Sequence, residues 1–367
     1  MEHRKLGSFS EMKYGRMPDN KKLLGKGEYP VFSGYRIVGY YDECNIDKQE
    51  LIVVARGVGG TGDVKLSPGA CFLTNLSIAV IVDESVALKE YLYYYFQINN
   101  LRYLDSGSAQ SQITITDLKN VVVPIPSLDQ QRKVVEILSR YDEKIEVNNK
   151  INDNLQQQAL AIFQRELLRE GELPDGWTSS SLLDIANYLN GLAMQKFRPA
   201  DGENGLPVLK IKELRQGSCD ASSELCSPSI KPEYIVHDGD VIFSWSGSLL
   251  VDLWCGGTCG LNQHLFKVTS EKYPKWFYYS WTAHHLARFV AIAAEKATTM
   301  GHIKREELAK AAVVIPDAVS MERIGGILQP MYDLIISNRI ENRKLTTLRD
   351  TILPQLMSGE LDVSDLT

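Results

Sequence analysis

Apolar side chains recur in alternating steps of four and three residues along two long stretches of this chain. The first stretch runs from Val134 to Ile162, and the second, from Ile324 to Ile352, repeats it at an offset of 190 residues. This spacing forms a heptad seam, which is typical of helices that pack against one another in a coiled coil. The pattern therefore predicts two long helices with matching seams.

Asparagine interrupts both seams at the same two positions, Asn148 and Asn152 in the first and Asn338 and Asn342 in the second. A buried seam asparagine costs stability unless another polar group meets it, so it penalises wrong registers. If the helices run antiparallel, Asn148 lies near Asn342 and Asn152 near Asn338. We interpret all four as register-setting residues. Arg349 occupies one further seam position, and we expect it near the end of the seam with its head group in water.

The duplication extends upstream of the helices, because residues 118–126 fall on 308–316 at the same offset of 190 and Ile113 falls on Ile303. Short apolar runs bounded by glycine, proline and asparagine predict strands at 51–55, 72–82, 240–244 and 313–315. Aromatic-rich helices are expected near 88–103 and 275–294. Ser127 and Gln130 have the spacing of a capping box, which predicts the start of the first long helix.

These patterns predict an α/β (α+β) chain with two globular mixed α/β heads, each followed by a long helix. The predicted segments are the first head at 1–126, a central spacer helix at 127–173, the second head at 174–316 and a C-terminal spacer helix at 317–367. A length of 367 residues suits two or three domains that each have their own core.

Composition narrows the function classes. Hydrophobic residues make up 44% of the chain, and the longest apolar runs have the length of core strands, so no membrane span is predicted. The first residues lack the apolar segment of a secretory signal, and six cysteines without such a signal indicate reduced thiols in the cytoplasm. The net charge of −6 argues mildly against nucleic acid, but most of the acidity lies on the helices and leaves the heads nearly neutral.

Two motifs suggest small ligands, and both are weak. Gly57–Gly62 matches the glycine spacing of a dinucleotide site, but another strand and a turn follow instead of the required helix. Cys255 and Cys259, with Cys219, Cys226, His237 or His264, lack a standard zinc spacing, so buried structural cysteines are the preferred interpretation. No catalytic motif stands out in the sequence.

The chain resembles the specificity subunits of type I restriction–modification enzymes. The resemblance rests on two variable heads that each end in an Ile-Pro or Pro-x-Pro sequence, on long helices with an Ile-x-x-Asn seam, and on a Gly-Glu-Leu at 171–173 and again at 359–361. The run at 28–40 and the Pro-Asp-Gly-Trp at 174–177 are similar to the openings of such heads. The likeness covers essentially the whole chain.

This resemblance implies a non-catalytic subunit in which each head is a target-recognition domain for one half of a split site in double-stranded DNA. The helices would pair antiparallel, with pseudo-twofold symmetry, and set the unread gap. Two methyltransferase (M) subunits and two restriction (R) subunits are the implied partners, with no membrane. No cofactor is expected in this chain, whereas S-adenosylmethionine, ATP and magnesium are expected on the partners.

On this interpretation, candidate DNA-binding residues are basic side chains that set register on phosphates and polar side chains that reach base edges. In the first head they are Lys13, Arg16, Lys21, Lys22, Lys26, Arg36, Arg56 and Lys65. In the second head they are Lys196, Arg198, Lys210, Lys212, Arg215, Ser244, Ser246, Asn262, Gln263 and His264. Asn75 is expected near the position of Asn262 if the heads align at an offset of 187.

Two other functions remain open from the sequence alone. One is a coiled-coil scaffold of a multiprotein complex that binds no DNA, and the other is an enzyme with a nucleotide cofactor at Gly57–Gly62. The first head also lacks a tryptophan opening like that of the second, so we expect its N-terminal edge to be less completely built.

Overall fold

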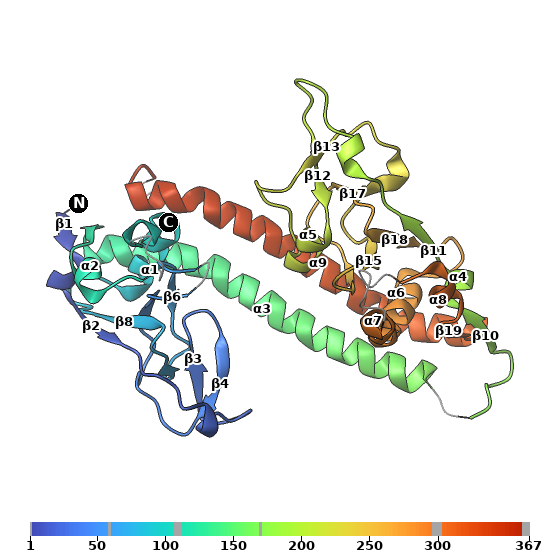
Figure 1. Cartoon of the computed structure of the whole chain (residues 1–367), viewed down its shortest axis with the longest axis horizontal. Coiled ribbons are helices and arrows are strands. Elements are labelled where there is room, and N and C mark those ends of the chain that lie inside the picture. Colours follow the sequence, from blue (N-terminus) through green and yellow to red (C-terminus); the bar gives the residue numbers. More distant parts are fainter. Residues whose placement is uncertain (1, 58–59, 106–111, 169–170, 296–302, 362–367) are drawn as a thin grey trace. The chain divides into compact units, whose positions relative to one another are not determined.

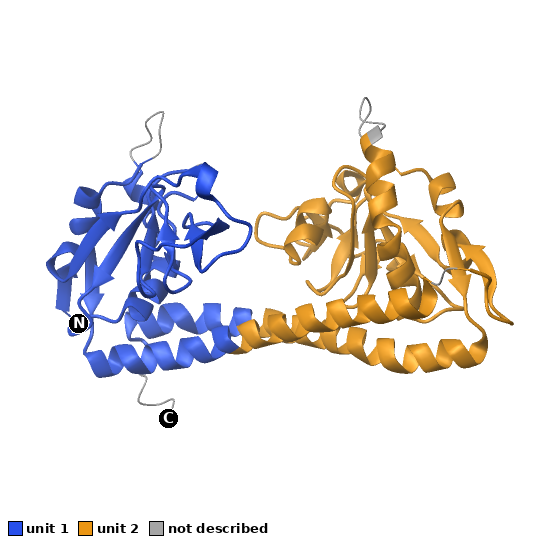
Figure 2. Ribbon diagram, turned by 90° about the horizontal axis from the view of Figure 1, so that it is seen from below, with its two compact units in different colours: residues 1–143, 346–367 blue, residues 144–345 orange. Residues whose placement is uncertain are grey.

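The computed structural model describes residues 2–57, 60–105, 112–168, 171–295 and 303–361. They form two compact units, one of residues 1–143 with 346–367 and one of residues 144–345 (Figure 2). Each unit contains one sheet-bearing head and part of each of two long helices, α3 (Leu128–Leu167) and α9 (Ala318–Ser358) (Figure 1). The predicted fold class of two mixed α/β heads, each followed by a long helix, is confirmed. The four-segment division remains a prediction, because each compact unit includes parts of both helices.

The first head is built around two sheets. The larger is antiparallel, in the order β2 (Ser10–Tyr14), β8 (Ser77–Val82), β5 (Leu51–Val54), β6 (Val64–Leu66). The smaller has the order β4 (Ile37–Tyr41), β3 (Tyr29–Phe32), β7 (Phe72–Leu73), with β3 and β7 parallel. Two strands pair at the edge, β1 (Glu2–Lys5) and β9 (Val122–Ile125), and the helices are α1 (Lys89–Ile98) and α2 (Ile115–Lys119).

The second head repeats this plan with additions. Its larger sheet has the order β11 (Asn187–Asn190), β18 (Leu265–Thr269), β15 (Val241–Ser244), β16 (Leu250–Leu253). Its smaller sheet has the order β13 (Leu225–Cys226), β12 (Leu206–Leu209), β17 (Cys259–Leu261), β14 (Ile235–Val236), and β10 (Thr178–Ser181) pairs with β19 (Ala312–Ile315). The helices are α4 (Leu182–Ile185), α5 (Ile211–Gln216), α6 (Lys275–His284), α7 (Leu286–Glu295) and α8 (Arg305–Ala309).

Backbone hydrogen bonds show that the repeat extends to individual residues. The Ile113 amide donates to the Ala55 carbonyl at 3.0 Å, and the Ile303 amide donates to the Trp245 carbonyl at the same distance. Both pairs keep the offset of 190 that links Ile113 with Ile303 in the sequence. The predicted duplication therefore includes backbone hydrogen bonds within the heads as well as the long helices.

The two long helices run antiparallel within each unit. In the second unit, Asn338 donates from Nδ2 to Asn152 Oδ1 at 2.9 Å, and Asn148 donates to Asn342 Oδ1 at 2.8 Å. Each step forward along α3 is thus matched by a step back along α9, in the antiparallel orientation that the resemblance implied. The helices have 40 and 41 residues, so each exceeds its predicted seam and extends roughly 60 Å at 1.5 Å per residue.

Seam residues also complete the cores of the heads. In the first unit Val134 and Leu138 of α3 are buried against α1 and the larger sheet, together with Leu353 of α9. In the second unit the core is richer in aromatic side chains, and it includes Ile324 and Leu328 of α9. Each head therefore buries apolar surface against both helices of its own unit, which stabilises head and helix together.

The ends of the helices agree with their predicted caps. The Gln130 amide donates to Ser127 Oγ and the Ser127 amide to Gln130 Oε1, so the capping box at the start of α3 is confirmed. Gly359 follows the last residue of α9 with φ at 76°, the left-handed conformation typical of a C-terminal stop. Gly171 also has a positive φ, but residues 169–170 before it lie outside the described part of the chain.

Four local predictions need correction. The predicted strand 72–82 is two strands, because a turn at 74–76 separates β7 from β8. The aromatic helix near 275–294 divides into α6 and α7 at His285. The edge of the first head is as fully built as that of the second, since β1 pairs with β9 over four residues, as β10 does with β19. Arg349 is not left to water, because it forms ion pairs with Asp142 and Asp350.

Among the described helices, none has a stretch that is both long and apolar enough to cross a bilayer.

Candidate nucleic-acid interface

The chain crosses closely over a turn at the end of β2 in the first head. A Cβ atom on Gly15 would lie 2.1 Å from the carbonyl oxygen of Thr74, a distance that no side chain tolerates. The Gly15 amide also donates to the Ser77 carbonyl at 3.0 Å. Glycine is required here because two backbones touch, and the contact fixes the turn between β7 and β8.

Three predicted arginines come from separate segments that meet at this turn. The Arg16 amide donates to the Leu73 carbonyl at 2.9 Å, and the Arg56 amide donates to the Leu76 carbonyl at 3.0 Å. Arg36 lies in the turn that follows β3, which is tied to β8 by Ser77 Oγ donating to the Ser33 carbonyl. The fold therefore gathers Arg16, Arg36 and Arg56 around residues 73–77.

The second head has the same crossing. A Cβ atom on Gly191 would lie 2.3 Å from the carbonyl oxygen of Asn262, and the Leu192 amide donates to the Leu261 carbonyl at 2.9 Å. Lys210 follows β12, whose last residue Leu209 accepts a hydrogen bond from the Asn262 amide. The Trp245 amide donates to the His264 carbonyl at 3.4 Å, so this turn at 261–265 gathers Lys210, Ser246 beside Trp245, and the predicted polar run 262–264.

The predicted alignment of Asn75 with Asn262 is wrong by one residue. The Asn75 amide donates to the Arg16 carbonyl, and the Gln263 amide donates to the Leu192 carbonyl. Asn75 therefore corresponds to Gln263, and the heads align here at an offset of 188. A loop of different length between the glycine crossing and the turn hides this register in the sequence.

The basic candidates of the first head lie at the surface, on strands, a 3-10 turn and loops. Lys13, Arg16, Lys21, Lys22, Lys26, Arg36 and Lys65 are exposed, and within the described residues none of them forms an ion pair. Lys13 donates from Nζ to the Asn45 carbonyl at 3.1 Å. An exposed cation without a carboxylate partner is available to a phosphate, so this surface suits a polyanion.

Arg56 and Lys65 differ from the other first-head candidates. Arg56 is half-buried, and its Nε atom is buried without a hydrogen-bond partner among the described residues. Lys65 lies on the edge strand β6 and lines a pocket of about 540 Å³ together with Val135 and Asp142 of α3. The same pocket is lined by Gly34 and Tyr35 of the turn that carries Arg36, so Lys65 lies between that turn and α3.

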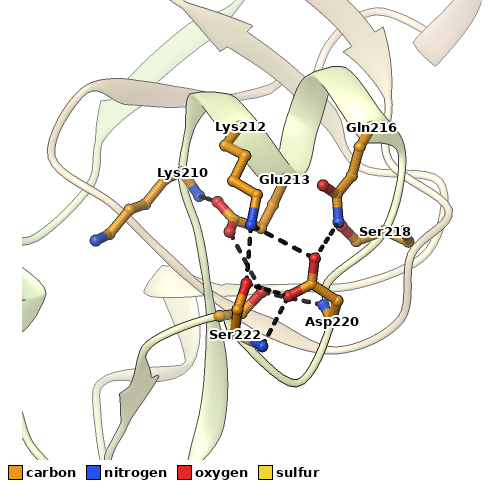
Figure 3. Close-up of polar contacts among 8 residues, drawn as sticks. Lys210, Lys212, Glu213, Gln216, Ser218, Asp220 and Ser222 are labelled. Atoms are coloured by element: carbon orange, nitrogen blue, oxygen red, sulfur yellow. Dashed lines mark hydrogen bonds and ion pairs between the residues drawn. The ribbon is translucent and has the colours of Figure 1, made fainter. Parts of the chain in front are cut away.

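The basic candidates of the second head are largely paired with carboxylates, and Figure 3 shows one of these pairs, Lys212 with Asp220. Lys210 Nζ lies 2.5 Å from Glu224 and Arg198 lies 3.2 Å from the same carboxylate, while Lys212 lies 3.5 Å from Asp220. The Lys210 ammonium lowers the pKa of Glu224, so this carboxylate stays ionised at neutral pH. DNA would have to compete with these pairs, whereas no ion pair is recorded for Lys196 or Arg215 in the described structure.

Asp220 organises the loop beside α5. Its carboxylate accepts hydrogen bonds from the Ser222 hydroxyl at 2.5 Å and from Gln216 Nε2 at 3.2 Å, and these contacts lower its pKa, with Ser222 as the larger cause (Figure 3). Lys212 also donates to Ser222 Oγ at 2.9 Å. The loop is thus held in one conformation by its own charges.

The polar candidates of the second head mostly serve the fold. Ser244 is buried and donates to the carbonyls of Ser246 and Ser248. Asn262 is buried and accepts from the His264 amide at 3.3 Å, and Gln263 lies within 3.3 Å of the His264 ring. These contacts shape the turn. Gln263 and His264 keep partial exposure, so they are the better placed of the set for a base edge.

The alternative ligand sites gain no support. Cys226, Cys255 and Cys259 are buried free thiols, and no group of three metal-ligating side chains occurs in the part of the chain that the structure describes. Burial raises the pKa of the Cys255 thiol to about 11, which keeps it protonated. Part of the glycine loop, at 58–59, lies outside the described residues, but a strand, β6, follows it, as the sequence indicated.

Comparison with known proteins decides the family. The chain matches the model of the type I restriction modification DNA specificity domain over residues 1–157 and again over 174–347. It belongs to this family. The two matches correspond to the two head-plus-helix copies, and membership confirms the expectation of a non-catalytic specificity subunit.

Individual relatives agree with this assignment. The MjaIX specificity subunit of Methanocaldococcus jannaschii is 26% identical over 357 residues, which covers 88% of this chain and 81% of the relative. A type I specificity subunit of Mycoplasma pneumoniae, named as putative, is 30% identical over 161 residues, or 40% of this chain and 42% of the relative. The crystal structure of the S subunit from M. genitalium superposes with a TM-score of 0.65 at 18% identity and covers 97% of this chain and 95% of that one. At that identity the superposition shows the fold alone.

Sequence reasoning missed residues of this specificity subunit that the structure makes prominent. Tyr35 is 42% exposed beside Arg36, and its hydroxyl donates to the Arg56 carbonyl at 3.4 Å. Arg339 and Arg343 of α9 bind carboxylates of the second head. The only signal for the arginines is an Asn-Arg pair that occurs twice, at 338–339 and 342–343, one turn apart.

Proposed function

We propose that this specificity subunit reads a bipartite site in double-stranded DNA, with one half-site per head and an unread gap set by α3 and α9. The observation that carries the proposal is the matched turn, at 73–77 in one head and 261–265 in the other, each gathering predicted DNA-binding residues from three segments. Two copies of one recognition surface suit a target made of two halves. Loops on a rigid sheet are also common places for binding residues.

The proposal includes the assembly around the chain. Two methyltransferase subunits dock on heads and helices, and two restriction subunits join for cleavage, with S-adenosylmethionine, ATP and magnesium held by these partners. The heads are nearly neutral and the chain carries a net charge of −6. We therefore expect weak DNA binding by the chain alone, with partner subunits supplying phosphate contacts in the cytoplasm.

The test is to express the chain with its methyltransferase subunit and map modified adenines across a host genome at single-base resolution. A split motif with one gap length is expected. Replacing either head with that of another specificity subunit should change one half of the motif and leave the other half unchanged. An assembled complex that is supplied with methyl donor and leaves no sequence-specific methylation would overturn the proposal.

A scaffold that binds no DNA is the second candidate, and the ion pairs of Lys210, Arg198 and Lys212 favour it for the second head. The first head separates the two functions, because its candidate DNA-binding cations, unlike Arg4 or Arg102, form no ion pair in the described structure. Changing Arg16 and Arg36 together to methionine should abolish site-specific methylation if DNA is read. Under the scaffold function, every activity of the complex stays intact.

A further inference from the structure

Arg339 of α9 is bound to the second head at the strand β16. Its NH1 atom lies 2.8 Å from Asp252 Oδ1 and donates to the Leu253 carbonyl at 3.1 Å. The Arg339 and Asp252 side chains are 27% and 25% exposed, so the ion pair is largely shielded from water. A charge-assisted bond in such a setting is directional and resists sliding.

Arg343, one helical turn further, holds the same head at a second point. Its two terminal nitrogens donate to the two oxygens of Asp238, each at 2.7 Å, in the bidentate geometry specific to arginine. The Arg343 guanidinium is the main cause of a lowered pKa at Asp238, so the carboxylate is ionised at neutral pH. Asp238 also accepts a hydrogen bond from the Gly257 amide at 2.8 Å, which links this ion pair to the loop after β16. The two ion pairs, Arg339 with Asp252 and Arg343 with Asp238, are together called the clamp.

The same two turns of α9 also set the coiled-coil register. Asn338 donates to Asn152 and Asn342 accepts from Asn148, so each register asparagine is followed directly by a clamp arginine. In α9, therefore, the asparagine that contacts α3 and the arginine that contacts the second head are neighbours in the sequence. A shift of either partner along α9 would disturb both sets of contacts.

The first spacer helix carries no such arginines. At the offset of 190, Arg339 corresponds to Asn149 and Arg343 to Asp153. Asn149 instead accepts a hydrogen bond from Asn342 Nδ2 at 2.9 Å. The clamp is therefore a feature of the second copy and not of the duplicated plan.

We propose that Arg339 and Arg343 are positioning residues that fix the second head on α9 and thereby restrict recognition to one gap length. This inference rests on the proposed bipartite reading of DNA. The second head already packs apolar side chains against Ile324 and Leu328 of α9. The two ion pairs add directional contacts one turn apart, on β16 and on the turn at 237–240, and these oppose both rocking and sliding of the head. Without them the second head accepts half-sites displaced by a base pair.

The experiment uses the full complex with its methyltransferase subunits. Arg339→Met/Arg343→Met is compared with the parent chain and with Lys344→Met, which removes a charge from an exposed neighbouring position of α9. Substrates carry both half-sites with the gap varied one base pair at a time. The measured quantity is the ratio of methylation at the preferred gap to methylation at gaps one base pair longer or shorter.

The double variant should lower this ratio roughly tenfold while still methylating the preferred gap, and Lys344→Met should match the parent. A purely structural loss reduces methylation at every gap alike and leaves the ratio unchanged, and an unchanged ratio overturns the inference. If the double variant does not assemble, the two single variants, which each retain one clamp, are judged by the same ratio. A parent complex without any gap preference counts against the proposed function itself, so the two failures are distinguishable.

Discussion

At the scale of single residues, Gly15 of the first head is a position where the backbone leaves no room for a side chain. Its missing side chain lets β2 pass over the Thr74 carbonyl, where a Cβ atom would lie at 2.1 Å. Gly15→Ala should lower the free energy of unfolding by roughly 2–3 kcal/mol, because backbone on both sides must move to make room. Chemical denaturation measures the effect.

Gly25→Ala is the matched control for this change, since nothing lies within 4 Å of a Cβ atom at Gly25 and its φ is not positive. We expect its unfolding free energy to stay within about 0.5 kcal/mol of the parent. Equal losses for the two alanine variants would mean that the crossing at Gly15 is not tightly packed in solution.

Replacing Glu224 tests whether its carboxylate keeps Lys210 and Arg198 of the second head from binding DNA phosphates. Glu224→Gln releases Lys210 and Arg198, so binding of the assembled complex to non-specific DNA should strengthen. The slope of log affinity against log salt should steepen by about one for each new phosphate contact. Fluorescence anisotropy over a salt series gives both quantities.

The control for Glu224 is Glu233→Gln, which removes the same charge from an exposed residue of the same head that has no ion-pair partner within the described part. A general gain from a less negative chain would appear in both variants. Only a gain confined to Glu224→Gln supports masking of the two cations.

At the scale of elements, Glu166 of α3 and Arg323 of α9 join the helices of the second unit at 2.7 Å. The Arg323 guanidinium is the main cause of a lowered pKa at Glu166. A lowered carboxylate pKa stabilises the fold above the unfolded value of 4.5, and this contribution is lost as pH falls through the folded value. Glu166→Gln should therefore cost about 1–2 kcal/mol at pH 7 and progressively less below pH 4.5.

Thermal melts of parent and Glu166→Gln at several pH values measure this difference. The difference between the two melting temperatures should decrease as the solution is acidified from pH 7. A constant difference would show that the charge of Glu166, which Arg323 and Arg165 share, does not contribute and that the loss at pH 7 comes from packing.

The four seam asparagines form two hydrogen-bonded pairs in adjacent turns, so both members of each pair have to be changed together. Replacing only Asn148 and Asn338 would leave Asn152 and Asn342 without these partners. Replacing all four with leucine should raise the melting temperature, because buried amides give way to apolar contacts, and should loosen the register. Spin labels at positions 150 and 344 on the two helices measure the register as a distance distribution.

A broadened distribution together with a raised melting temperature is the expected result. If the distribution stays as narrow as in the parent, the apolar seam alone sets the register. A lowered melting temperature would show that the amide cluster stabilises the pairing as well as selecting it.

The elements also show what sequence could and could not predict. Heptad spacing identifies both helices, and it gives the partners of Asn148 and Asn152 once the helices are taken as antiparallel, an orientation that the family resemblance implied. The pairing of Lys210 with Glu224 depends on how the loop between α5 and β13 folds back, and no periodicity encodes that. The turn at 74–76 was likewise hidden, because apolar residues continue on both sides of it.

At the scale of the whole molecule, the sequence predicted two heads and two helices because the head-plus-helix pattern occurs twice, at an offset of 190 residues. Which residues touch DNA is a separate question. The candidates were chosen by residue type, and the structure gathers some of them around the two turns, while Lys65 lies beside α3 and Ser244 is buried. Burial and loop geometry decide such roles, and neither follows from residue type.

If α3 and α9 set the unread gap, lengthening both helices should lengthen that gap. One extra heptad inserted after Ile145 in α3 and another after Leu345 in α9 keeps both seams in phase and lengthens the paired segment. Seven residues at 1.5 Å each add about 10 Å, which spans roughly three base pairs of DNA. The methylated gap should therefore grow by about three base pairs, as read by mapping methylation on a library of gap lengths. The same insertion in α3 alone shifts its seam against α9, so it should abolish site-specific methylation, whereas an unchanged gap in the matched variant would show that the helices do not set it.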